Sequence, residues 1–72
     1  MSAQSEKLGA MAGQIADFFR SYPQDEAVRA IAEHINKFWT RKMRTEFVDL
    51  PDIRSGAADP LLVAAARAVR IG

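Results

Sequence analysis

Residues 31–39 have the sequence Ile-Ala-Glu-His-Ile-Asn-Lys-Phe-Trp, which contains the only histidine and the only tryptophan of the chain. Apolar side chains recur there three and four residues apart, a spacing that gathers them on one face of an α-helix. A basic segment follows Thr40, with Arg41, Lys42 and Arg44. The pattern predicts an amphipathic helix that buries one face and ends in aromatic and positively charged side chains.

The apolar pattern of this helix also occurs 20 residues earlier. Equivalent positions pair as Leu8 with Val28, Ile15 with Ile35, and Phe18-Phe19 with Phe38-Trp39. Pro23 lies between the two copies and cannot continue a helix. We therefore expect two helices, at about 5–21 and 25–39, packed as an antiparallel hairpin. A duplication and a chance likeness of two amphipathic helices both predict this hairpin.

Three further features organise the second half of the chain. Thr40 can cap a third helix, at about 41–50, which Pro51 would end. Residues 52–58 include Ser55-Gly56 and are predicted to form a loop. Asp59-Pro60 is a typical helix start and predicts a C-terminal helix at about 60–70. Because no segment alternates like a strand, the predicted fold class is all-α, with one small helical domain over residues 1–72.

The length and composition limit how such a domain is stabilised. A chain of 72 residues buries only about 60% of the surface that it exposes when unfolded, so it depends on close helix packing or on a partner. It has no cysteine, which excludes disulfides, zinc fingers and iron–sulfur ligation. No apolar run is long enough to span a bilayer, and the N-terminus lacks the apolar core of a signal peptide. We expect a cytoplasmic protein without membrane association.

The charge is small overall but unevenly distributed. The formal net charge is +1, which disfavours a dedicated nucleic-acid binder. Residues 1–36 carry three basic and five acidic side chains, whereas residues 37–72 carry seven basic and four acidic ones. Such an asymmetry favours a polar docking surface in the second half of the chain.

Catalytic and ligand-binding patterns are missing from the sequence. His34 would need a carboxylate partner such as Asp17 or Glu33 and a pocket, and a boundary histidine with a structural role is the better interpretation. There is no glycine-rich phosphate loop and no metal-ligating cluster. We therefore predict no catalytic, cofactor-binding or metal-binding residues, and no enzyme activity of this chain.

Aromatic and basic side chains at the end of the second helix are the candidate partner-binding residues. Ile31, Ile35 and Phe38 fit the core, while Trp39 fits the core and a contact surface equally well. Gly9 and Gly13 share a face of the first helix, which favours close approach of another backbone there. The predicted contact surface consists of Trp39, Arg41, Lys42, Arg44, Phe38 and Lys37.

A set of short motifs recurs in order along nearly the whole chain: Lys7-Leu8, Met11-Ala12, Gln14-Ile15-Ala16, Phe18-Phe19, Tyr22-Pro23, Glu26-Ala27-Val28, His34-Ile35, Phe38-Trp39, Met43-Arg44, Pro60-Leu61, Val63 and Ala66. In this order and spacing the chain resembles the delta subunit of NAD-dependent, molybdenum-containing formate dehydrogenases. One departure follows the Phe-Trp pair, where the family tends to have Asp-Pro and this chain has Thr40-Arg41.

The resemblance implies a non-catalytic accessory subunit that supports assembly or stability of the complex by docking on its large, molybdenum-bearing subunit. In that family the molybdopterin cofactor, iron–sulfur clusters and FMN belong to the alpha, beta and gamma subunits, which reduce NAD, and the delta subunit binds none of them. Two alternatives stay open at this point: a helix-turn-helix-like protein that binds nucleic acid through the second and third helices, and a self-associating hairpin.

Overall fold

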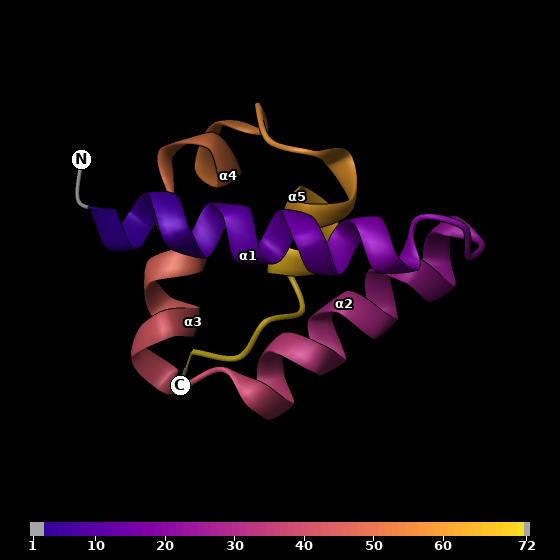
Figure 1. Ribbon diagram of the computed structural model, residues 1–72, viewed down its shortest axis with the longest axis horizontal. Helices are drawn as coiled ribbons and strands as arrows, with labels where there is room; N and C mark the ends of the chain where they lie inside the picture. The colour runs from indigo at the N-terminus through magenta and orange to yellow at the C-terminus, as the bar shows by residue number, and fades with distance from the viewer. Residues whose placement is uncertain (1–2, 72) are drawn as a thin grey trace.

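The two longest helices, α1 (Ala3–Phe19) and α2 (Gln24–Phe38), run in opposite directions in the computed structural model (Figure 1). The structure describes residues 3–71, with side chains from Glu6 onward. The predicted antiparallel hairpin is therefore confirmed. The ends of its first helix differ from the predicted 5–21, because α1 already includes Ala3 and ends at Phe19, where the Tyr22 N–H donates to the Phe19 carbonyl at 3.0 Å.

Three shorter helices follow, α3 (Arg41–Val48), α4 (Pro51–Ser55) and α5 (Pro60–Ala66). Two of them begin at the predicted caps. Thr40 Oγ1 accepts a hydrogen bond from the Met43 N–H at 3.1 Å at the start of α3. Asp59 Oδ1 accepts one from the Leu61 N–H at 2.9 Å at the start of α5. These oxygens satisfy backbone donors that a first helical turn leaves without partners.

The larger differences from the predicted elements lie in the second half of the chain. Pro51 does not simply end a helix: α3 ends at Val48, before the predicted residue 50, and Pro51 is the first residue of α4. The predicted loop 52–58 is therefore partly helical. Gly56 closes α4 with a φ of 80°, a conformation that costs glycine little. The C-terminal helix ends at Ala66 rather than near residue 70, and residues 67–71, here called the C-terminal segment, form a turn and an irregular stretch.

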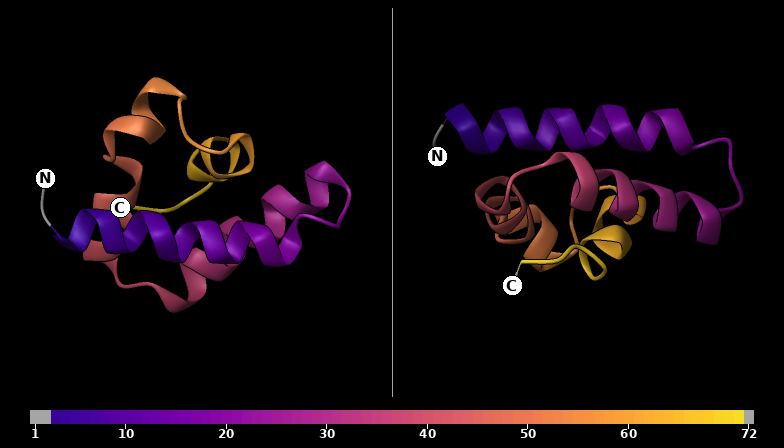
Figure 2. Two further views of the ribbon diagram at one scale, coloured as in Figure 1. Left: turned by 45° about the horizontal axis from the view of Figure 1, so that its top comes forward. Right: turned by 90° about the horizontal axis from the view of Figure 1, so that it is seen from below.

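The core lies between α1 and the other four helices, which gather on one side of it (Figure 2). No strand occurs in residues 3–71, and none of their helices has the length and apolar character that crossing a bilayer requires. Several core positions are alanines, so the helix backbones approach one another closely. The buried apolar residues are Leu8, Ala12, Ala16, Ala27, Ile31, Ala32, Ile35, Trp39, Phe47, Ile53, Leu62, Ala65 and Val69.

Candidate partner-binding surface

At the end of α2 the two neighbouring aromatic side chains point in different directions. The helix ends at Phe38, and Trp39 has an extended backbone with φ −92° and ψ 144°. The Trp39 side chain is only 6% exposed and packs edge-on against Phe47, with ring centroids 5.7 Å apart. Phe38 is 66% exposed. Our assignment of Phe38 to the core was wrong, and Trp39 is a core residue, because the chain leaves the helix between them.

Two of the four predicted basic contacts bind the protein's own C-terminal segment. Arg44 Nε donates to the Arg70 carbonyl at 2.6 Å, and Arg44 Nη1 donates to the Trp39 carbonyl at 2.6 Å. Arg41 Nε donates to the Ile71 carbonyl at 3.3 Å. These guanidinium groups already satisfy backbone acceptors, so they are poor candidates for docking on a second protein.

Lys37 and Lys42 keep their charges at the surface. Both are exposed, and neither forms an ion pair with another side chain in the part of the chain that the structure describes. The Lys37 ammonium lies 5.7 Å from the centroid of the Phe38 ring, within the range of a cation–π contact. Phe38, Lys37 and Lys42 are thus the members of the predicted contact surface whose side chains remain accessible for binding.

An apolar hollow, here called the α1–α2 groove, lies along the seam between the two long helices and has a volume of about 490 Å³. The sequence analysis missed the contribution of α1 to this surface. The repeat could have indicated it, since Phe18 occupies the position equivalent to Phe38 and is 71% exposed. The residues that line the groove are Met11, Gln14, Ile15, Phe18, Phe19, His34 and Trp39.

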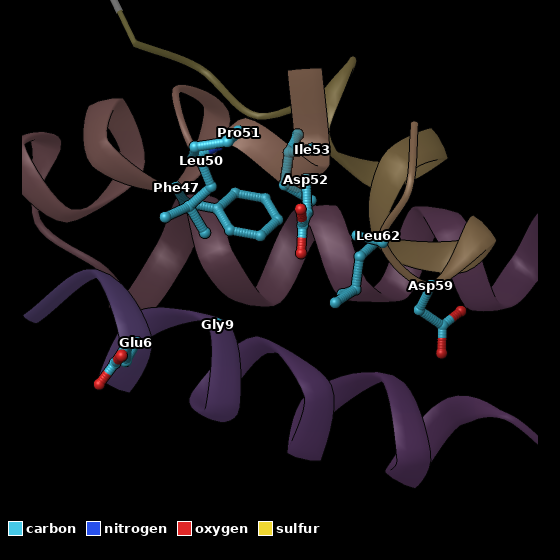
Figure 3. A pocket seen from close by; sticks show the side chains of 10 residues that line it. Glu6, Gly9, Phe47, Leu50, Pro51, Asp52, Ile53, Asp59 and Leu62 are labelled. Carbon is cyan, nitrogen blue, oxygen red and sulfur yellow. The ribbon is translucent and has the colours of Figure 1, made fainter. Parts of the chain in front are cut away.

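A second hollow, of about 390 Å³, lies between α1 and the three short helices (Figure 3). Phe47, Ile53 and Leu62 come from α3, α4 and α5 and face α1 across it. Gly9 borders this hollow, and apart from the adjoining backbone of α1 no atom lies within 4 Å of the position that a Cβ would take at Gly9 or Gly13. The close backbone approach predicted for the two glycines is therefore not made within residues 3–71. Acidic side chains also line the hollow, namely Glu6, Asp52 and Asp59.

His34 is half-buried and packs against Phe38, with ring centroids 4.8 Å apart. Of the two carboxylates considered as its partner, Asp17 and Glu33, Asp17 accepts a hydrogen bond from Arg20 Nη2 at 2.8 Å instead. Among the described residues, no three His, Cys, Asp or Glu side chains are placed to hold a metal ion together. The surroundings of His34 are those of a residue at the border of an apolar surface.

Arg20 ties the end of α1 to the start of α5. Its Nη2 donates to Asp59 Oδ2 at 2.6 Å as well as to Asp17. The hydrogen bond from Arg20 lowers the pKa of Asp59 below its ordinary value, and the hydrogen bond from the Leu61 N–H lowers it by a smaller amount. The same pairing raises the pKa of Arg20, chiefly through Asp59. This ion pair joins structural elements and lies apart from the α1–α2 groove.

The family model of the NADH-dependent formate dehydrogenase delta subunit, FdsD, matches residues 7–68 of the 72-residue chain. The chain belongs to this delta-subunit family. No curated protein and no solved structure was found to match it. The resemblance to formate dehydrogenase delta subunits is thereby confirmed, and as a delta subunit of such a complex the chain has partner subunits. The exposed apolar groove of this delta subunit is therefore a candidate contact surface for one of those partner subunits.

Proposed function

We propose that the chain is a non-catalytic accessory subunit that docks on the large, molybdenum-bearing subunit of an NAD-dependent formate dehydrogenase and stabilises the assembled complex. The observation that carries this proposal is the exposure of Phe18 and Phe38 beside an apolar groove, in a member of the delta-subunit family. Large exposed apolar patches on small proteins are typical of interaction sites. The family membership supplies the complex in which that site is used.

In this proposal the redox groups lie on the other subunits. An iron–sulfur cluster takes thiolate ligands, and the chain has no cysteine. Its lone histidine packs on Phe38 instead of joining a set of carboxylates. The residues present therefore do not fit a metal cluster, and their chemistry favours packing over electron transfer.

The test compares the complex prepared with and without this chain. We expect the complex that lacks it to be recovered in lower yield and to lose formate-dependent NAD reduction faster on mild heating, while the turnover per bound molybdenum stays unchanged. Adding back the purified chain should restore the lifetime. A lower turnover per molybdenum in an otherwise intact complex would contradict a non-catalytic role. Failure of the tagged chain to recover the large subunit would contradict docking.

The contacts of Arg41 and Arg44 disfavour the helix-turn-helix alternative. In that motif α3 would be the helix that enters the DNA groove, and both of these α3 side chains donate to carbonyls of the C-terminal segment. Phosphate binding would depend on such side chains and would weaken steeply with salt. Titration of the chain with duplex DNA at two salt concentrations tests this alternative directly.

A further inference from the structure

We propose that the docking face is the α1–α2 groove and that it takes an amphipathic helix of a partner subunit, with an apolar ridge flanked by carboxylates. This inference rests on the proposed function and specifies which surface is used and what it binds. It keeps Phe38, Lys37 and Trp39 from the contact surface predicted from the sequence, and it leaves out Arg41 and Arg44, whose guanidinium groups bind carbonyls of the C-terminal segment.

The shape of the groove favours a helix as the ligand. Its lining comes from α1, from His34 of the neighbouring α2 and from Trp39 just beyond α2, so that an apolar furrow follows the seam between the two helices. Side-chain ridges of a third helix fit such furrows, with anchors about one turn apart. On the α1 side Lys7, Met11, Gln14 and Phe18 lie on one helical face, spaced three or four residues apart.

Two phenylalanines provide the apolar anchors. Phe18 lines the groove from α1. Phe38 is not part of the lining but lies next to it, because its ring packs against the groove-lining His34 with centroids 4.8 Å apart. Their exposed fractions, 71% and 66%, are the largest among the exposed large hydrophobic residues. Aromatic side chains at the centre of an interface contribute much of its binding energy, because they bury a large area with few rotatable bonds.

The charges around the groove favour an acidic partner. The ammonium of Lys37 lies over Phe38, and Lys7 precedes Met11 by one turn. The carboxylate of Asp17, near the other end of α1, pairs with Arg20, which also pairs with Asp59. Glu6, directly before Lys7, lines the second hollow. Glu33, one turn before Lys37, is then the acidic side chain left to oppose the two lysines, and they outnumber it.

A second copy of this chain fits the groove less well. A symmetric dimer places the same patch on both sides of its interface. The groove of one copy, flanked by Lys7 and Lys37, would then face the equally lysine-flanked groove of the other. Like charges brought together across an interface cost binding energy, whereas carboxylates flanking an apolar ridge would pair with them.

The test uses a tagged chain co-expressed with the other subunits and measures how much partner protein is recovered per chain. We expect Phe18→Ser with Phe38→Ser to lower recovery at least about tenfold, since loss of one anchor alone often weakens binding about tenfold. Lys37→Glu should weaken recovery and make it less sensitive to salt. Ile71→Ser is the matched control, because Ile71 is also an exposed apolar side chain, at 45%, and does not line the groove.

Each outcome separates the two proposals. If the unaltered chain recovers no partner subunit, the proposed function fails. If it recovers partners and the double variant does so equally well, docking through the groove is overturned. If the unaltered free chain forms a dimer in sedimentation that the double variant does not form, while both recover partner subunits equally well, the occupant is a second copy. In that case the inference is also overturned. Circular dichroism of the variants should match that of the unaltered chain, because both phenyl rings are exposed.

Discussion

At the level of single residues, the geometry of one backbone step decides which aromatic side chain stabilises the core. The helical backbone of α2 stops at Phe38, and the extended conformation of Trp39 turns its indole inward onto Phe47. Phe47 is among the largest fully buried side chains of the described residues. The contact therefore links the end of α2 to the centre of the core, and the two aromatic neighbours have separate roles.

Trp39→Ala should lower the free energy of unfolding by about 3–5 kcal/mol, the usual cost of removing a large buried aromatic side chain. In a chain of this size a single hydrophobic core rarely supplies more than about 3–5 kcal/mol, so the variant should be partly or largely unfolded. Phe38→Ala should change the free energy by less than about 1 kcal/mol, since its ring is mostly exposed. Urea unfolding followed by far-ultraviolet circular dichroism measures both. Equal losses for the two variants would contradict this division of roles.

Asp59 gives the stability a defined dependence on pH. Its pKa in the folded chain is lowered by Arg20 and by the Leu61 N–H, so the ionised form stabilises the fold. This contribution is complete above the unfolded pKa of about 3.9 and is lost as the pH falls through the lower folded value. Asp59→Asn should therefore be less stable than the unaltered chain at neutral pH and approach it in acid. Asp59→Ala also removes the helix cap, which costs about 0.5–2 kcal/mol. Thermal unfolding as a function of pH measures both effects.

At the level of helices, α1 contains two glycines that its fold does not need. At Gly9 and at Gly13, a Cβ atom would have no atom within 4 Å apart from the adjoining backbone of α1. Gly9→Ala and Gly13→Ala should each raise the free energy of unfolding by about 0.5–1 kcal/mol, because alanine loses less backbone entropy in a helix. Gly56→Ala is the contrast, since its φ of 80° strains any residue with a side chain, and it should destabilise the chain. Chemical denaturation of the three variants gives the comparison.

Helix starts were predictable from the sequence where a side chain itself makes the cap. Thr40 and Asp59 accept the expected backbone hydrogen bonds, so their identity was enough to place α3 and α5. Pro51 was ambiguous, because proline both ends one helix and begins the next. The five residues of α4 are too few to show a helical apolar period, and nothing else in that segment distinguished it from a loop.

The candidate surface was predicted only in part, for a reason that concerns helix ends. A regular helix continued through Trp39 places Phe38 and Trp39 together at one end, and sequence spacing alone does not show that the backbone changes there. Phe18 is the residue equivalent to Phe38 in the 20-residue repeat, and it is exposed as well, so the repeat could have predicted its place on the surface. Contacts between Arg44 and the carbonyl of Arg70 were not predictable, because they join residues 26 positions apart.

At the level of the whole molecule, the C-terminal segment is held by side chains from two other helices. Asn36 of α2 donates to the Ala68 carbonyl at 3.1 Å and accepts from the Arg70 N–H at 2.7 Å. Arg41 and Arg44 of α3 donate to the carbonyls of the last described residues. This explains why α5 stops at Ala66: its continuation would withdraw those backbone groups from their partners. Val69 is nevertheless buried.

Asn36→Ala should release the C-terminal segment while leaving the rest of the fold in place. We expect the Arg70 amide to exchange with solvent fastest in Asn36→Ala, because its acceptor is lost. Exchange should be intermediate in Asn36→Asp, which keeps an acceptor oxygen and loses only the donor to Ala68. Hydrogen exchange read by nuclear magnetic resonance tests this order, with amides of α1 as an internal reference. Unchanged exchange at Arg70 in Asn36→Ala would contradict it.

The position of Trp39 has a spectroscopic consequence. It is the only tryptophan of the chain, it is 6% exposed, and it contributes to the floor of the α1–α2 groove. An indole shielded from water emits at shorter wavelength than a hydrated one, so its fluorescence should shift to the red when the core opens. A helix seated in the groove would change the same emission without unfolding. The chain thus carries its own optical reporter, placed where one intrinsic fluorophore reports on both folding and docking.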